Sequence, residues 1–176
     1  MSQVKGFGMK RDMRNMSNRE VTLNPQEMKV ATWVGKCRQK AAEELGYSNH
    51  NQCGKDDTRL HIDGAAGELA FAKTFKLYPE SIFDNFGSLG SYDVWFPELG
   101  GVDVKTTANK DGRLNIEYRK TKNPADVYAL MIGSDGKFEH AGMIAGIDAL
   151  AKRYITDGGN GAFFAIPQDD LADDLR

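Results

Sequence analysis

Residues 92–107 read YDVWFPELGGVDVKTT, two runs rich in β-branched and aromatic residues on either side of the turn segment PELGG. This pattern predicts a β-hairpin. With the turn centred near Glu98, Asp93 lies opposite Asp103 across the two strands. One face of the hairpin is then apolar and the other is largely charged: Val94, Phe96, Val102 and Val104 on the first, Asp93, Trp95, Asp103 and Lys105 on the second. We expect the apolar face to pack in the core.

The charged face brings two carboxylates close together. Opposed residues of a hairpin lie about 5 Å apart, so Asp93 and Asp103 repel each other unless a cation lies near both. The pattern Asp-x-Lys is weak evidence alone, since Asp135-Gly136-Lys137 repeats it. There, however, Asp-Gly is typical of a hairpin turn. Asp103 differs from Asp135 because other acidic residues are predicted to lie close to it.

A third acid, Glu68, lies in the segment GAAGELAFAKTFK, which predicts a helix over residues 64–76 capped by Asp63. Helical periodicity puts Glu68 on the same side as Gly64, Phe71 and Phe75, within an apolar stripe. A buried carboxylate is costly unless it is paired or bound to metal. The alternative is a glutamate near a helix start, where the helix dipole favours a negative charge.

Three carboxylates and one lysine suit divalent-metal hydrolysis of phosphodiesters. Hard oxygen ligands favour Mg²⁺, and we also consider Mn²⁺. Lys105 would orient or deprotonate the attacking water and offset the negative charge that develops at the phosphate.

The segments GAAGELAFAKTF, YDVWF and GVDVKTT resemble the PD-(D/E)XK nuclease superfamily, over about residues 60–150. Small phage-encoded members look most similar. The resemblance implies a restriction-endonuclease-like fold and a catalytic set of Glu68, Asp93, Asp103 and Lys105. It implies metal binding by Glu68, Asp93, Asp103 and the backbone carbonyl of Val104. Tyr92 stands where the family has proline, and no specificity domain is visible.

We therefore expect a metal-dependent nuclease that cuts nucleic acid, with DNA the favoured substrate. Restriction enzyme, junction resolvase, repair nuclease and exonuclease all remain open, as does a homodimer. The alternative is a catalytically inactive module on the same fold that binds nucleic acid or a protein. Basic residues after the second hairpin strand are candidates for phosphate contacts, although such a cluster is often only a solvated face. They are Lys110, Arg113, Arg119, Lys120 and Lys122.

The rest of the chain predicts one α/β or α+β domain with a mixed central sheet flanked by helices. A helix begins at Asn24-Pro25, since Asn is a favoured cap and Pro a favoured first residue, and it ends at Gly46. Residues 47–59 are polar and predict a loop. Strands are expected over residues 81–86, 92–96, 102–107, 114–118, 127–133, 138–144 and 162–166, and a short helix over 147–154.

The chain has 176 residues and a formal net charge of -2, which argues against binding driven by overall positive charge. We predict a flexible basic arm over residues 1–22 and a single domain over 23–176. No apolar run is long enough for a membrane span or a secretory signal. We expect a cytoplasmic protein, in the host-cell cytoplasm if a phage encodes it, with no membrane partner.

Cysteine and histidine residues do not predict a zinc site. The four that come closest to a set lack the paired short spacings of structural zinc sites, although such a module remains a third option. They are Cys37, His50, Cys53 and His61. We expect the two cysteines to be free thiols.

Overall fold

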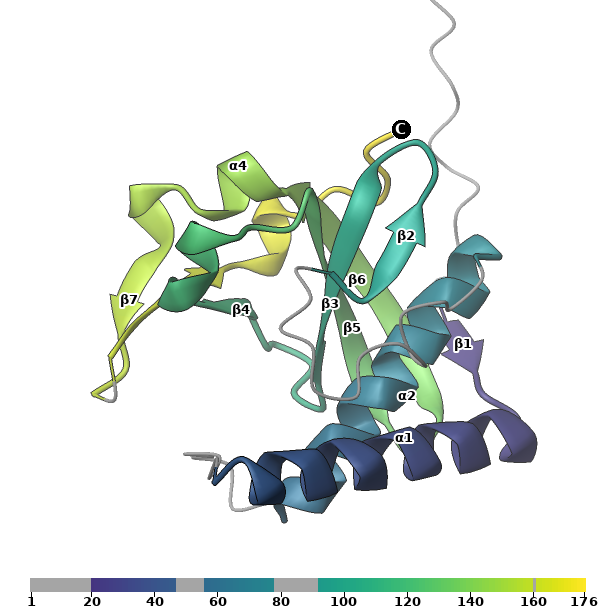
Figure 1. The fold of residues 1–176 in the computed structure, drawn as a ribbon. Helices are drawn as coiled ribbons and strands as arrows, with labels where there is room; N and C mark the ends of the chain where they lie inside the picture. The colour runs from purple at the N-terminus through teal and green to yellow at the C-terminus, as the bar shows by residue number, and fades with distance from the viewer. Residues whose placement is uncertain (1–19, 47–55, 78–91, 160) are drawn as a thin grey trace, which may run out of the picture.

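The computed structural model describes residues 20–46, 56–77, 92–159 and 161–176. The protein is a mixed α and β structure in which helices and a second, smaller sheet cover a curled mixed sheet (Figure 1). The mixed sheet and its helices confirm the predicted fold class. No helix in the described ranges has the length and apolar character of a membrane span.

Helix α1, Pro25–Glu44, begins and ends where the sequence predicts. The Asn24 side chain accepts hydrogen bonds from the backbone N–H groups of Gln26 and Glu27, both at 2.9 Å. In return the Glu27 carboxylate accepts the Asn24 N–H at 2.6 Å. This reciprocal pair is a capping box, which satisfies N–H groups that a helix start otherwise leaves unpaired. After the helix, Gly46 adopts a φ of 69°.

Helix α2, Asp57–Phe75, starts earlier than predicted. Asp56 is its cap, accepting the Thr58 N–H at 3.2 Å, so Asp63 is not a cap but a buried residue inside the helix. The prediction was also wrong in assigning residues 57–59 to a loop; the rest of that loop, 47–55, lies outside the described residues. The first turn of α2 is polar and has no apolar periodicity, so the sequence pattern did not indicate a helix there. A polar first turn is compatible with a helix when an acidic residue caps it.

The main sheet has the strand order β1-β6-β5-β3-β2. Strands β3 and β5 are parallel, and every other neighbouring pair is antiparallel. In the hairpin Val94 pairs with Val102 and Trp95 with Gly101, which confirms the predicted register. The strand bounds are β1 Glu20–Thr22, β2 Val94–Phe96, β3 Gly100–Thr107, β5 Val127–Ser134 and β6 Lys137–Ala145.

The second sheet has the order β4-β8-β7. Its strands are β4 Leu114–Glu117, β7 Ile155–Asp157 and β8 Ala162–Ile166. The short helices of this part of the chain are η1 Tyr118–Lys122, α4 Gly146–Ala149, η2 Lys152–Tyr154 and η3 Gln168–Asp170. The helix predicted over 147–154 is therefore two pieces, because Ala151 is extended between them. Strand β7 was not predicted, and the strand predicted over 81–86 lies outside the described residues.

Residues 20–22 correct the prediction of a flexible arm over residues 1–22. They form β1, where Val21 pairs with Phe138 of β6. Their partner is distant in sequence, so no local pattern announces this strand. Residues 1–19 of the arm lie outside the described part of the chain.

The main sheet is covered on both faces, and alternate residues of β5 show this. Ala129 and Met131 belong to the core between the sheet and helices α1 and α2. Tyr128, Leu130 and Ile132 belong to a second core shared with β4 and β8. Figure 1 shows α1 and α2 on one side of the sheet and β4, β7 and α4 on the other. The hairpin face carrying Val94, Phe96, Val102 and Val104 is buried, as predicted.

Candidate active site

Asp93 is held by the backbone of the neighbouring strand. It directly precedes β2, and its N–H donates to the Val102 carbonyl at 2.8 Å. Its side-chain Oδ2 accepts the N–H of Val104 at 2.8 Å. The carboxylate therefore occupies the edge of β3 just where pairing with β2 ends.

Asp103 lies in the interior of β3 and is 2% exposed. Lys105 Nζ lies 2.7 Å from its Oδ1, and Lys120 Nζ lies 2.9 Å from its Oδ2. Neither oxygen has a hydrogen bond of ordinary geometry to any described residue, so both contacts are ion pairs without good alignment. Burial by itself raises the pKa of Asp103, but the two lysines outweigh burial and lower it below its usual value.

Glu68 is buried as the helical stripe predicts, with 4% exposure. Arg38 of α1 binds both of its oxygens, with Nη1–Oε1 at 2.6 Å and Nη2–Oε2 at 2.8 Å. A forked pair of this kind is among the stronger side-chain contacts. Glu68 is thus paired with an arginine, and the alternative of a glutamate near a helix start is wrong, because α2 begins at Asp57 and Glu68 lies in its middle.

Electrostatics place Glu68, Asp93 and Asp103 in one neighbourhood. The pKa of Asp93 is raised well above its usual value, first by burial and then by the negative charges of Glu68 and Asp103. Lys105 and the Val104 N–H lower it, but by less. Glu68 and Asp103 therefore both act electrostatically on Asp93.

Lys105 is a cation in this arrangement. Burial lowers the pKa of its ammonium group, whereas the negative charges of Asp103 and Asp93 raise it. The effect of the two acids is larger than that of burial, so the pKa lies above its usual value. Of the two roles that the sequence suggests for Lys105, positioning and charge compensation suit a protonated lysine, whereas deprotonation of water does not.

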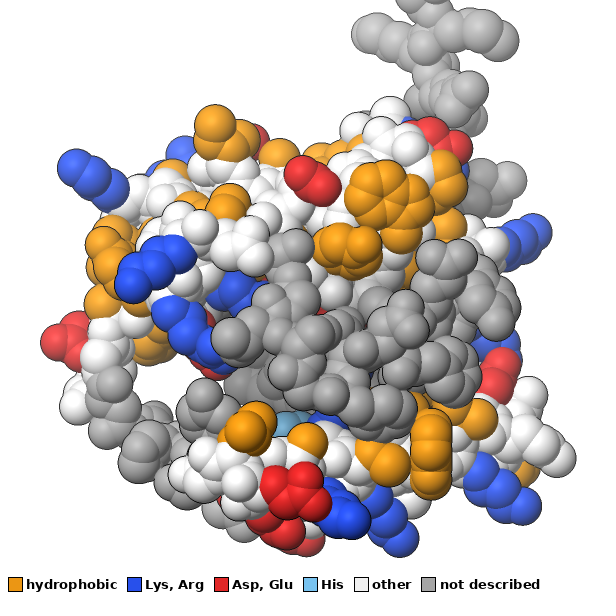
Figure 2. All heavy atoms as spheres, viewed as in Figure 1, with side chains coloured by type: hydrophobic (Ala, Val, Ile, Leu, Met, Phe, Trp, Pro, Cys, Tyr) orange, Lys and Arg blue, Asp and Glu red, His pale blue; other side chains and the backbone are white. Residues whose placement is uncertain are grey.

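The five predicted phosphate contacts separate in the structure. Lys120, on η1, is committed to Asp103, while Arg119 on the same turn pairs with Glu117. Arg113 lines a pocket beside Lys105. Lys110 and Lys122 are exposed. Figure 2 shows Lys and Arg side chains gathered on the face over β4 and the short helix that follows it.

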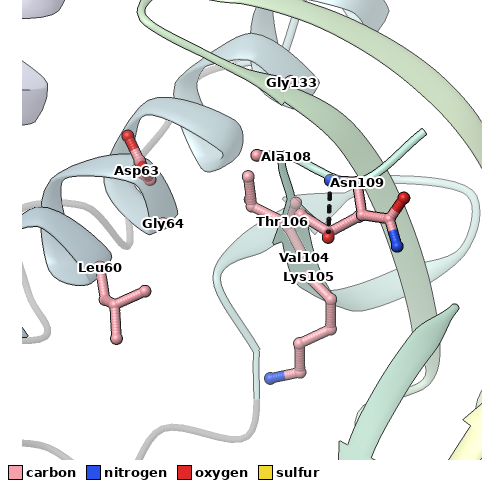
Figure 3. A pocket seen from close by; sticks show the side chains of 10 residues that line it. Leu60, Asp63, Gly64, Val104, Lys105, Thr106, Ala108, Asn109 and Gly133 are labelled. Carbon is pink, nitrogen blue, oxygen red and sulfur yellow. Dashed lines mark hydrogen bonds between the residues drawn. The ribbon is translucent and has the colours of Figure 1, made fainter. Parts of the chain in front are cut away.

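Lys105 lies on the walls of two pockets. One, of about 430 Å³, is bounded by Leu60 and Gly64 of α2 and by the end of β3 (Figure 3). The other, of about 570 Å³, lies between β3 and the second sheet and is lined by Arg113 and Phe163 among others. The lysine therefore lies between the two pockets.

The acids do not form a ready-made metal cage. Nowhere in the described ranges do three His, Cys, Asp or Glu side chains form a group that could hold a metal ion. Glu68 faces Arg38, which leaves Asp93 and Asp103 as the carboxylates nearest to Lys105. For the zinc alternative, Cys37 is a free cysteine. His50 and Cys53 lie outside the described residues.

Sequence reasoning missed Arg38, although a signal exists. Arg38 follows Val34 by four residues and so continues the buried stripe of α1 that includes Ala31. A basic residue in a buried stripe is expected to have an acidic partner. Glu68, which the sequence predicts to be buried, was the candidate partner for Arg38.

One protein family matches the chain, over residues 16–141, and is described as a family of unknown function (DUF5843). The chain belongs to the DUF5843 family. No curated protein and no solved structure matches it. The DUF5843 match contains Arg38, Glu68, the β2–β3 hairpin and Lys120, and it ends within β6. The charged residues of the candidate site thus lie in the part of the chain that matches the family.

Proposed function

We propose that this protein is a metal-dependent nuclease of the PD-(D/E)XK type. The observation that carries the proposal is the meeting of Asp93, Asp103 and Lys105 at one end of the β2–β3 hairpin, beside buried Glu68. Metal-dependent hydrolysis needs carboxylates that are close enough to repel each other. In a protein that binds no cation, this repulsion would only destabilise the fold. DNA is the substrate that we favour.

The arrangement of elements supports a restriction-endonuclease-like fold. Helix α2 packs on the sheet and carries Glu68, the β2–β3 hairpin carries the remaining acids, and β5 pairs in parallel beyond β3. The order of these elements along the chain is the order of the motifs in the superfamily that the sequence resembles.

The donor set suits a single hard cation. Mg²⁺ usually binds through one or two carboxylates and keeps several waters, so Asp93 and Asp103 are sufficient as side-chain ligands. The oxygens of Asp103 lack well-aligned hydrogen bonds. The Val104 carbonyl shares a strand edge with its N–H, which meets Asp93. These three groups would hold Mg²⁺ or Mn²⁺, and a bound ion would supply an activated water and neutralise phosphate charge.

The protein's own side chains then have separate tasks. Lys105, held by Asp103, presents a fixed positive charge towards the two pockets, where it would orient a phosphate and the attacking water. Arg113, in the pocket between β3 and the second sheet, would contact a neighbouring phosphate.

The test is incubation of the protein with linear, nicked, branched and single-stranded DNA, with and without Mg²⁺. Asp103→Asn and Lys105→Ala should each reduce cleavage by at least about 100-fold, the range for removal of one group that stabilises charge in the transition state. Lys152→Ala, on exposed η2, is the control for loss of a lysine. Cleavage that survives both site substitutions overturns the proposal.

The second candidate is a module that binds nucleic acid or a protein without cutting. The observation that favours it is that Arg38, Lys105 and Lys120 already neutralise the acids. A Mn²⁺ titration separates the two functions. Binding that Asp93→Ala does not weaken, together with absence of cleavage, favours the module.

A further inference from the structure

The acidic side chains at this site are matched by an equal number of basic side chains. Three carboxylates, those of Glu68, Asp93 and Asp103, lie among three basic groups, and these basic groups are Arg38, Lys105 and Lys120. Any divalent ion that enters must share its ligands with these cations or displace them. How firmly each cation is held therefore decides how many ions the site can take.

Arg38 is held firmly. Its guanidinium binds both oxygens of Glu68, and the pair joins two helices in tight contact. One turn earlier the two helices approach closely, since a Cβ on Gly35 would lie 2.6 Å from the backbone nitrogen of Ile62. The negative charge of Asp93 also acts on Arg38. Arg38 is thus a fixed positive charge on Glu68, in the part of α2 that packs closely on β3, where a Cβ on Gly67 would lie 1.9 Å from Thr106 Oγ1.

Lys120 is held less firmly. Its ammonium contacts one oxygen of Asp103 at 2.9 Å, whereas the guanidinium of Arg38 contacts both oxygens of Glu68. It belongs to η1, a five-residue 3₁₀ helix whose start has no side-chain cap. Lysine is a point charge on a flexible stem, whereas arginine binds a carboxylate through a planar fork. An incoming ion at Asp103 therefore displaces Lys120 far more readily than an ion at Glu68 displaces Arg38.

We propose that Arg38 takes the place of a second metal ion, so that the site binds one divalent ion, at Asp93 and Asp103, while Glu68 serves to hold the arginine. This inference rests on the proposed nuclease function and narrows it to a one-ion mechanism. Arg38 is a positioning residue for Glu68 and a permanent part of the charge that the site presents to phosphate. It gives Glu68 a different role from the metal ligation that the sequence led us to expect.

Binding of Mn²⁺ alone to the full chain tests the proposal, with calorimetry for the stoichiometry and electron paramagnetic resonance for the free ion. Wild type should bind one ion. Asp103→Asn should weaken binding by more than about 100-fold, because even an outer partner of a ligand contributes about 10 to 100-fold. The double variant Arg38→Gln with Glu68→Gln keeps the net charge and should bind one ion with affinity within about tenfold of wild type.

The single variant Arg38→Gln frees Glu68 and should bind a second, weaker ion. Because it leaves a buried carboxylate unpaired it could unfold, and the double variant keeps the test valid in that case. Lys40→Ala, on the exposed face of α1, controls for a lost charge on that helix. Unfolding curves confirm that each variant is folded.

The outcomes separate the inference from the function. Two ions in wild type, with Asp103→Asn abolishing both, leave the nuclease proposal standing and overturn the one-ion site. A double variant that loses its ion as Asp103→Asn does shows that Glu68 is a ligand, which also overturns the inference. Absence of binding to wild type overturns the nuclease proposal and the inference together.

Discussion

At the scale of single residues, Lys120 is the clearest addition that the structure makes to the site. The sequence places it in a cluster of phosphate contacts, whereas the structure pairs it with the same acid as Lys105. An ammonium group on a carboxylate oxygen competes with a metal ion for that oxygen. If the site binds a metal ion as proposed, Lys120 would compete with that ion for Asp103.

Removing this competitor should strengthen ion binding. We expect Lys120→Met to raise the affinity for Mn²⁺ severalfold at neutral pH, measured by calorimetry, because Asp103 then has one fewer cation to exchange. Lys152→Met on η2 should leave the affinity unchanged. If Lys120→Met weakens Mn²⁺ binding, the lysine supports the site and does not compete with the ion.

At the scale of elements, the site depends on close contact between α2 and β3. A Cβ on Gly67 would lie 1.9 Å from Thr106 Oγ1, whereas a Cβ on Gly64 would meet nothing within 4 Å. Gly67→Ala should therefore lower the free energy of unfolding by about 1 to 3 kcal/mol through overpacking. Gly64→Ala in the same helix should raise it by up to about 1 kcal/mol. Urea unfolding of both variants checks the contrast, and equal effects would contradict this contact.

The start of α1 should make stability depend on pH. Burial raises the pKa of Glu27, but its bonds to Lys73 and to the Asn24 N–H outweigh burial and lower it below the usual 4.5. A lowered pKa in the folded state means that Glu27 stabilises the fold above pH 4.5 and loses this effect as the pH falls through the folded value. Urea unfolding between pH 7 and pH 3 should show a smaller loss of stability in Glu27→Gln than in wild type. An equal loss would show that Glu27 makes no such contribution.

Local elements could be predicted from the sequence, and long-range partners could not. The hairpin register of Asp93 and Asp103 followed from a short turn, and the burial of Glu68 followed from helical periodicity. The partner of Glu68 is on another helix and the partner of β1 is on a distant strand, so neither is encoded within a local window. The early start of α2 escaped prediction because its first turn is polar.

At the scale of the whole molecule, β5 joins the two cores. Two adjacent residues of β5, Leu130 and Met131, point to opposite faces of the sheet. Leu130 points towards the second sheet and Met131 towards the helices. Both are buried, with 1% and 0% exposure. A strand shared in this way should make the cores unfold together.

Substitution of each residue tests this coupling. Leu130→Ala and Met131→Ala should each lower the free energy of unfolding by about 2 to 5 kcal/mol, the usual cost of truncating a buried side chain. Fluorescence and circular dichroism should report one coincident transition in both variants. Two separated transitions would show independent units and would contradict the single domain predicted for residues 23–176.

The pairing of β1 with β6 has a consequence for how the chain folds during synthesis. Val21 meets Phe138, so one edge of the main sheet closes only after the distant strand β6 has left the ribosome. Helices α1 and α2 are close in sequence and can associate before then, which would bring Arg38 to Glu68 early. Glu68 would thus be neutralised before the strands that carry Asp93 and Asp103 have paired.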